Sequence, residues 1–459
     1  MKKLLIIATL AAVGMGACSK DDGVSAPEDL RKYVQVTIPE NAASGETRTS
    51  VDGTTTSWVA GDKVAVSLYN GSTTEVCEFT VDRTGATTTF SGSVPVGSYT
   101  CAAAHYPFCA ATFDAVNKTF THTWGDAYCS TDLAAYDFMF STVYETPFVV
   151  DETTTVLPIA LTFRPLMARI GMKLALGANE TPKYVTFTTD DNVLPTAGTV
   201  NADGTFSASA LTNSLTVETD RKEFTVGLLP VGVASKMSVH VTTTDGMTYS
   251  DKSFQLAGLK RNTHYTMNVP CRTKRFMLTV PDGVDTKYGT GTYKNNGFYS
   301  VDPATDPTGI FKDWYFYRAE LKNTTNTASG DKLKGKNRIQ LQVALGFNNS
   351  NNGAFVTAPI QCDGTKTVTV SFTAATNRVI MSANYWIGVT DNGPITSDWL
   401  RDINKISPHA EGSIPISDNV SHSHTFTVTN GQRIMMKVYS SGGGTPCHLE
   451  LADFTYTVE

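Results

Sequence analysis

The chain has 459 residues, of which 41% are hydrophobic and only 17% are charged, and its formal net charge at pH 7 is −6. An average soluble domain carries roughly 25% charged residues, and here Thr, Ser, Asn and Gly take their place. This composition excludes a disordered chain, a helical bundle and a multi-pass membrane protein, and the acidic balance argues against a nucleic-acid-binding surface. At roughly 150 residues per domain, the length predicts about three domains.

The first residues have the pattern of an export signal. Two lysines precede an apolar stretch over residues 4–13, and small residues lead from there to Cys18. The stretch is too short to span a bilayer comfortably, and this order of segments is typical of a signal peptide. Residues 15–17 resemble a bacterial lipobox, after which the peptide is removed and the sulfur of the next Cys carries lipid. We predict a signal peptide over 1–17 and lipidation of Cys18, with an ordinary secretory signal as the alternative.

The segment after Cys18 resembles a further targeting signal. Residues 19–22, Ser-Lys-Asp-Asp, resemble the acidic tag that sends lipoproteins to the outer face in one group of Gram-negative anaerobes. The expected location is therefore the outer membrane, with a lipid anchor and surface exposure. The alternative is a solvated linker.

Beyond residue 30, apolar and polar residues alternate along most of the chain, which is typical of strands with one buried face. In chain order, examples are Val34/Val36/Ile38, Val64/Val66/Leu68, Ile339/Leu341/Val343/Leu345, Val368/Val370/Phe372 and Phe454/Tyr456/Val458. Helical periodicity is scarce, and one short helix is expected within Ser130–Phe138. The pattern predicts an all-β protein built from sandwiches.

Turn signals and changes in the residue pattern suggest where the domains end. We expect a tether over 18–29, a first β-sandwich over 30–163 and a second over 164–271. Residues 272–274 then form a link to a last domain over 275–459, which has the size of a jelly roll.

Several segments, in order, carry a family resemblance. They are Thr47–Thr49, Trp58–Val64, Leu161–Ile170, Phe224–Pro230 and Leu259–Tyr265. Through them residues 30–270 resemble the fimbrillin family, the pilins and pilus-associated lipoproteins of type V pili. The resemblance implies two tandem transthyretin-like β-sandwiches and export to the surface as a lipoprotein.

The resemblance also implies maturation by cleavage after Arg48, beyond a first strand over residues 33–38. Removal of that strand would open a groove of unpaired backbone groups, which a strand of a neighbouring subunit could fill. The alternative is that Arg48 is a surface residue in a Thr-rich loop. In shaft-forming fimbrillins the chain ends soon after the second domain. Here residues 275–459 follow, which favours a tip or accessory subunit over a shaft subunit.

The last domain resembles the galactose-binding-like jelly rolls of bacterial carbohydrate-binding modules, most clearly in Thr367–Phe372 and Leu449–Tyr456. Sugar recognition uses flat aromatic faces together with polar groups that hold hydroxyls. The candidate ligand surface comprises Tyr385, Trp386, Asp391, Asn392, Asp398, Trp399 and Arg401. Trp399 follows a turn-like stretch and is expected to be exposed. The alternative for these aromatics is a place in the core, which we expect for Trp314.

Other reactive residues give weaker patterns. Cys101, Cys109 and Cys129 lie close in sequence, which leaves a disulfide or buried free thiols open, and no C-x-x-C motif occurs. His422 and His424 share one face of a predicted strand, but no third metal ligand accompanies them, so both are expected to face solvent. We predict no catalytic residue, no metal and no cofactor.

These observations predict a non-enzymatic cell-surface lipoprotein, an adhesin or a pilus tip or accessory subunit. Its expected partners are other pilus subunits through strand complementation and outer-membrane lipid through Cys18. Host or dietary glycans or surface proteins are further expected partners, and nucleic acid is not. A surface glycan-binding protein for nutrient capture is the first alternative. A glycan-active enzyme is the second, because the two carboxylates of a glycosidase need not be close in sequence.

Overall fold

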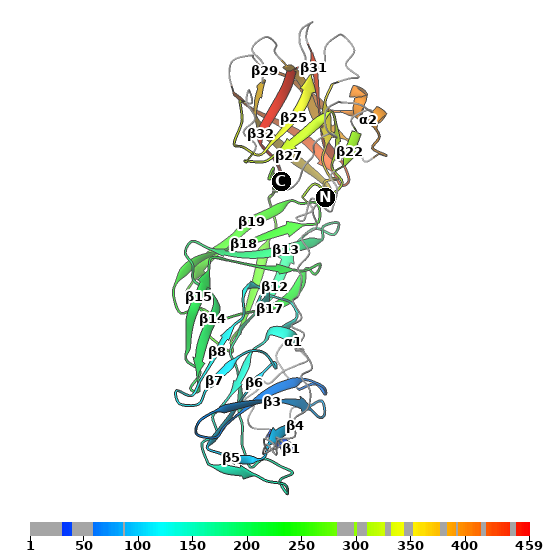
Figure 1. The fold of residues 1–459 in the computed structure, drawn as a ribbon. Coiled ribbons are helices and arrows are strands. Elements are labelled where there is room, and N and C mark those ends of the chain that lie inside the picture. Colours follow the sequence, from blue (N-terminus) through cyan, green and yellow to red (C-terminus); the bar gives the residue numbers. More distant parts are fainter. Residues whose placement is uncertain are drawn as a thin grey trace, which may run out of the picture.

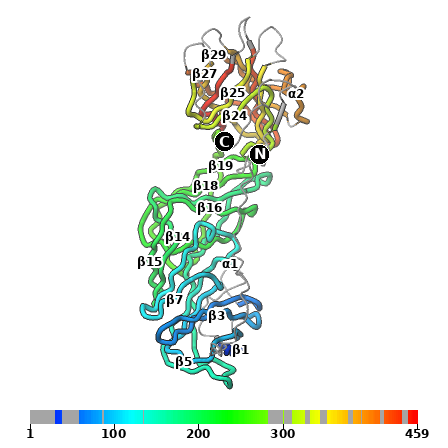
Figure 2. Tube along the Cα trace, in the orientation of Figure 1, coloured from blue at the N-terminus to red at the C-terminus, as the bar shows by residue number. Residues whose placement is uncertain are grey.

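The computed structural model describes residues 30–38, 58–85, 88–281, 298–300, 310–325, 332–343, 352–376, 383–391, 393–414, 419–440 and 447–459. In these ranges nearly all of the regular secondary structure is β-strand, which confirms the all-β prediction. The strands are stacked into an elongated molecule, with the first strands at one end and the last strands at the other (Figures 1 and 2). Along this axis we distinguish an N-terminal unit (residues 30–165), a middle unit (168–270) and a C-terminal unit (the described residues from 298 to 459), with the strand over residues 274–277 between the last two.

The N-terminal unit contains a seven-stranded sheet. In spatial order its strands are β1 (Arg31–Ile38), β4 (Thr88–Pro95), β3 (Thr74–Val81), β2 (Lys63–Tyr69), β6 (Cys101–Tyr106), β9 (Met139–Ser141) and β11 (Phe163–Pro165). Beside it β5 (Gly97–Tyr99) pairs with β10 (Phe148–Val150). The alternation in β2 places Val64 and Val66 in a core around Trp58, whose ring makes edge contacts with Phe90 and Phe163 at centroid distances of 5.0 and 5.2 Å.

A four-stranded sheet joins the N-terminal unit to the middle unit, and a three-stranded sheet lies within the middle unit. The hairpin β7 (Thr112–Asp114) and β8 (Thr119–Thr123) pairs with the hairpin β14 (Leu194–Asn201) and β15 (Phe206–Thr212) in the order β15-β14-β8-β7. The other sheet has the order β17 (Glu223–Leu228), β12 (Ala168–Ala175), β20 (His264–Pro270).

A shared core backs these two sheets. One apolar cluster takes side chains from Cys101 to Val269, and within it Phe138 is stacked between the rings of His105 and His122. The short helix α1 (Leu133–Tyr136) follows the 3-10 turn η2 (Asp126–Tyr128) and confirms the predicted helix. The N-terminal and middle units are therefore packed through a single continuous core.

A longer sheet runs without a break from the middle unit into the C-terminal unit. In spatial order it contains β16 (Ser214–Glu218), β13 (Pro182–Thr189), β18 (Ser235–Thr243), β19 (Thr248–Leu256), β21 (Lys274–Met277), β32 (Cys447–Val458), β25 (Arg338–Val343) and β24 (Ala319–Lys322). β21 pairs with β19 on one side and with β32 on the other. Lys274, the last residue of the expected link, is therefore part of a strand whose backbone is held in a sheet from both sides.

The C-terminal unit is a sandwich of two sheets. β27 (Thr365–Thr376) pairs with β32 and with β30 (Val420–Thr429). The facing sheet has the order β22 (Phe298–Ser300), β23 (Tyr315–Tyr317), β26 (Ala354–Val356), β31 (Arg433–Ser440), β28 (Ala383–Thr390), β29 (His409–Ile414). Trp314 is fully buried between the sheets, which confirms its prediction as a core residue. The helix α2 (Ser397–Arg401) and the 3-10 turn η4 (Ile403–Lys405) cover the outer face of the facing sheet.

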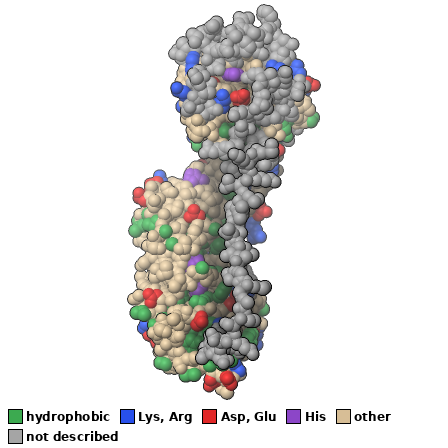
Figure 3. Space-filling view, viewed as in Figure 1, with side chains coloured by type: hydrophobic (Ala, Val, Ile, Leu, Met, Phe, Trp, Pro, Cys, Tyr) green, Lys and Arg blue, Asp and Glu red, His purple; other side chains and the backbone are tan. Residues whose placement is uncertain are grey.

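Six cysteines in the structure are free thiols: Cys77, Cys101, Cys109, Cys129, Cys271 and Cys362. Of the two possibilities left open for the cysteines near residue 109, the structure thus has free thiols. On the visible face of the N-terminal and middle units, charged side chains lie scattered and do not gather in one patch (Figure 3). Among the described residues, no helix combines the length and the apolar character needed to span a bilayer.

Candidate functional site

The first candidate site is the edge strand β1. It pairs antiparallel with β4 over its whole length, from Arg31 opposite Pro95 to Ile38 opposite Thr88. Its side chains alternate, so that Val34 and Val36 are fully buried in the core whereas Tyr33 is 67% exposed. β1 therefore seals one edge of the N-terminal core.

The other edge of β1 is partly occupied too. The backbone N–H of Gln35 donates to the carbonyl of Thr155, and the N–H of Leu157 donates to the carbonyl of Gln35, at 2.9 and 2.8 Å. β1 thus lies in a slot between β4 and residues 155–157. A strand held by backbone hydrogen bonds and a row of valines can be replaced by another strand of similar pattern.

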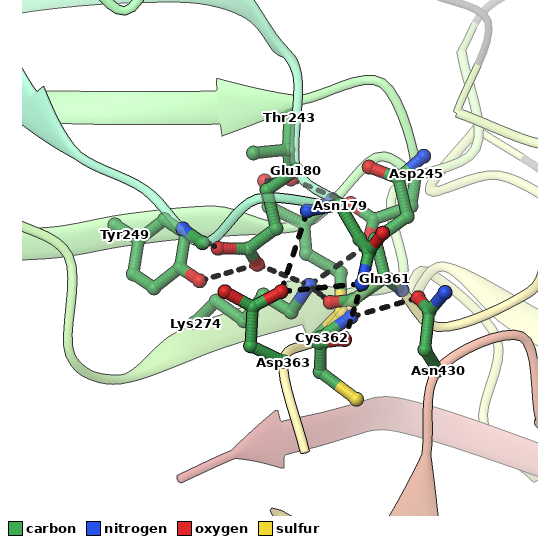
Figure 4. Close-up of polar contacts among 12 residues, drawn as sticks. Asn179, Glu180, Thr243, Asp245, Tyr249, Lys274, Gln361, Cys362, Asp363 and Asn430 are labelled. Carbon is green, nitrogen blue, oxygen red and sulfur yellow. Dashed lines mark hydrogen bonds and ion pairs between the residues drawn. The ribbon is translucent and has the colours of Figure 1, made fainter.

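The second candidate site is the junction between the middle and C-terminal units, where a cluster of charges is buried around β21 (Figure 4). The Lys274 ammonium lies 2.8 Å from a carboxylate oxygen of Glu180 and 3.0 Å from one of Asp245. It also donates to the backbone carbonyl of Gln361, which belongs to the C-terminal unit. A buried ammonium is tolerated only where its three donors find acceptors, and here all three do.

The excess carboxylate of this cluster is held by neutral donors. The Tyr249 hydroxyl donates to Glu180 at 2.6 Å, and burial together with this hydrogen bond raises the pKa of Tyr249 well above its ordinary value. Asp245 accepts from the Thr243 hydroxyl at 2.5 Å and from the Gln361 N–H at 3.2 Å. The cluster therefore connects both units by charge-assisted hydrogen bonds.

A second contact crosses the same junction (Figure 4). The Asp363 carboxylate of the C-terminal unit accepts from the N–H groups of Ala178 and Asn179 at 2.7 and 3.3 Å. Those N–H groups hold the pKa of Asp363 below its ordinary value. The approach is so close that a Cβ on Gly177 would lie 2.4 Å from the carboxylate, so a larger residue there would require Asp363 to move.

The predicted ligand surface does not form as one surface. Tyr385 is fully buried, and its hydroxyl lies 2.9 Å from ring nitrogens of both His422 and His424. Its place on a ligand surface is therefore wrong: Tyr385 is in phase with the inward residues of β28. Trp386, on the opposite face, is half-buried, stacks on Tyr439 at 3.8 Å and donates from its ring nitrogen to a Glu411 oxygen at 2.8 Å.

The remaining members of that surface are spread around α2. Trp399 lies within α2, half-buried against the apolar cluster of Leu400, and not in an exposed turn as expected. Asp398 is 91% exposed and pairs with Arg401 at 3.3 Å. Asp391 accepts from the Gln432 amide at 3.1 Å. Trp386 and Trp399 do share one apolar cluster, and Asn392 lies outside the described residues.

The histidine pair is also placed differently from the prediction. His422 and His424 face inward, stacked at 6.3 Å, and burial lowers the pKa of both. They are not solvent-facing because they alternate with exposed serines and share the phase of Phe426 and Val428. Within the described ranges, no group of three or more His, Cys, Asp or Glu could hold a metal ion.

Two predicted modification sites, Cys18 and Arg48, lie outside the described residues. The junction residues Glu180, Asp245 and Lys274 were missed in the sequence. One signal was present: Lys274 lies in phase with Phe276, and a charged residue on the apolar face of a strand is a candidate for a buried ion pair. Its partners gave no signal, because they come from loops far away in the chain.

Comparison with known proteins gives the following. A family model described as fimbrillin-like matches residues 47–283, just over half of the chain. No curated protein matches the chain in sequence.

Among solved structures, a "putative cell adhesion protein" from Bacteroides uniformis is 16% identical, with 53% of this chain and 94% of that chain covered and a TM-score of 0.36. A fimbrial assembly protein from Parabacteroides distasonis is 10% identical, with 55% and 96% covered and a TM-score of 0.30. The C-terminally truncated tip fimbrial protein Mfa3 from Porphyromonas gingivalis is 12% identical, with 55% and 96% covered and a TM-score of 0.27.

Proposed function

Since the chain belongs to the fimbrillin-like family, we propose that it is a cell-surface pilus tip or accessory subunit that acts by binding, without catalysis. The observation that supports this proposal most strongly is the position of β1, whose backbone pairs with β4 and whose Val34 and Val36 are fully buried. The segment between β1 and the rest of the N-terminal unit contains Arg48. Cleavage after Arg48 would leave β1 attached by non-covalent contacts alone.

Assembly then proceeds by strand exchange. Each buried valine contributes about 1.5–3 kcal/mol, and loss of β1 would also leave the backbone groups of β4 unpaired. A strand from a neighbouring subunit that restores both the valine-like row and the hydrogen bonds would replace β1 at little net cost. The C-terminal unit, joined through β21, lies at the end of the molecule opposite β1 (Figure 1). That position suits a unit that makes contact with a target.

Anchoring and organisation belong to the same proposal. Lipid on Cys18 would hold the precursor in the outer membrane, and several acyl chains, at about 0.8 kcal/mol per buried CH₂, anchor firmly. We also propose the three domains at the limits expected from the sequence, 30–163, 164–271 and 275–459, with the last as a jelly roll. The Lys274 cluster would then fix the second domain to the third.

The experiment is to express the full chain with its signal on cells and to sequence the N-terminus of the mature surface protein. We expect Thr49 as the first residue, and the protein in SDS-resistant pilus polymers. Arg48→Ala should retain lipidated Cys18 and stay out of polymers. The matched control Arg83→Ala, at an exposed site of the same unit, should behave as wild type. A wild-type monomer that keeps Cys18 and never enters polymers would overturn the proposal.

A further inference from the structure

A groove of about 650 Å³ lies on the outer face of the long sheet, where the middle unit meets the C-terminal unit. Its size falls in the range of roughly 300–1,000 Å³ that is usual for small-molecule sites. The middle unit supplies most of the lining, β21 supplies Arg275 and Met277, and Ile310 comes from the C-terminal unit. The groove exists only because β21 joins the two units in one sheet.

A single row of side chains crosses the floor of this groove. Tyr184 in β13 pairs with Thr242 in β18, Thr242 with Thr248 in β19, and Thr248 with Arg275 in β21. Neighbouring strands lie about 4.8 Å apart, so this row extends over about 14 Å. That length accommodates a short oligosaccharide of a few linked rings.

The polar groups of the row suit a sugar. Tyr184 is half-buried and offers an aromatic ring at one end. The hydroxyls of Thr242 and Thr248 lie 2.9 Å apart in the centre, and each keeps further capacity to donate or accept. Met277 is 59% exposed and gives an apolar wall. An aromatic face, aliphatic wall and hydroxyls along one line provide both stacking and hydrogen bonds to a sugar.

The charge of the groove selects among sugars. Lys183 lies 5.0 Å from the centre of the Tyr184 ring, and Arg275 is exposed at the other end. In the described part of the chain, Arg275 makes no ion pair, and the lining contains no acidic side chain. The nearby Asp245 is turned inward to Lys274. A free guanidinium in such a setting favours a carboxylate, which it can hold with two parallel hydrogen bonds.

We propose that this groove binds a short oligosaccharide bearing a carboxylate, with Arg275 on the carboxylate and Tyr184 stacked on a sugar ring. This site is distinct from the ligand surface expected around α2. It deepens the proposed function by giving the surface protein a class of target, but the groove does not depend on pilus assembly.

The test uses the purified full chain and isothermal titration with four probes: trigalacturonate, 3′-sialyllactose, and the neutral maltotriose and lactose. At least one acidic probe should bind ten-fold or more tightly than its neutral counterpart, and its binding should weaken with salt. Binding of trigalacturonate alone would identify a uronate ligand, and binding of 3′-sialyllactose alone would identify a sialylated one. Because no pilus is present, failure here leaves the assembly proposal untouched, and failure of assembly leaves this result untouched.

Variants locate the site. Arg275→Gln should lower affinity for the acidic probe ten-fold or more and remove its preference over the neutral one. Tyr184→Ala should weaken binding as well. The matched control Arg272→Gln changes an exposed arginine outside the groove and should bind as wild type. Unchanged melting curves for Arg275→Gln establish its folding. The proposal is overturned if neither acidic probe binds at millimolar concentration, if the neutral probes bind equally well, or if Arg275→Gln binds as wild type.

Discussion

Lys274 and Glu180 form an ion pair at 2.8 Å between side chains that are 1% and 5% exposed, at the point where one sheet passes from the middle unit into the C-terminal unit. Burial makes such a pair weak evidence for net stability, but it makes the loss of one partner costly. The pair is therefore best understood as a device that fixes the geometry of the junction.

Lys274→Met should destabilise the chain by about 3–5 kcal/mol, because Glu180 and Asp245 would stay buried without their cation. Urea unfolding measures the effect, and limited proteolysis at the junction shows whether the two units separate. Adding Glu180→Gln and Asp245→Asn should recover part of the loss. As a control, Lys63→Met breaks an exposed pair with Glu78 and should cost under about 1 kcal/mol. Equal losses in the two lysine variants would contradict this account.

Val36→Asp should cost about 3 kcal/mol or more, because it places an unpaired carboxylate on the buried face of β1. Thr37→Asp introduces the same group one residue further, on the exposed face, and should change stability by about 0.5 kcal/mol at most. Thermal unfolding of both variants is the measurement. If the two variants have the same melting temperature, β1 does not contribute its valines to the core.

Acid should lower the free energy of unfolding through protonation of His105. Burial lowers the pKa of this histidine from 6.5 to about 4, so the unfolded chain binds the proton more tightly than the folded one. Its contribution is present in full above pH 6.5 and is lost as the pH falls from 6.5 towards 4, by about 3 kcal/mol in total.

His105→Phe, which keeps an aromatic ring beside Phe138, should remove this part of the pH dependence in unfolding experiments between pH 4 and 7. His122 adds a slope of the same sign, since burial lowers its pKa too. An unaltered slope in His105→Phe would rule out this histidine as the cause.

Trp314 and Trp399 should differ clearly in how much stability is lost when each is replaced by Ala. Trp314→Ala should cost about 3–5 kcal/mol, since its ring is fully buried among Phe276, Phe355 and other aromatics. Trp399→Ala should cost only about 1–2 kcal/mol, because its ring is half-buried beneath a five-residue helix. Urea midpoints of the two variants decide the matter, and similar losses would mean that α2 is part of the main core.

Much of the strand content could be predicted from alternation alone, because which face of a strand is buried depends on the side chains of that strand. The same rule would have placed Tyr385 correctly, since Ala383, Ile387 and Val389 share its phase and all are buried. It could not have placed Trp386, because that residue faces away from the main core and is covered by a separate element. Its environment depends on where residues beyond the strand fold back.

The sequence by itself determined the all-β class, the short helix near residue 133 and the burial of Trp314, since these follow from local patterns of size and polarity. Only the tertiary structure decided that β21 would be shared by two units and that Lys274 would meet Glu180, Asp245 and Gln361. These partners lie 94, 29 and 87 residues away from Lys274 along the chain. Which buried charges meet depends on the register and packing of distant strands, and local alternation carries no information about that register.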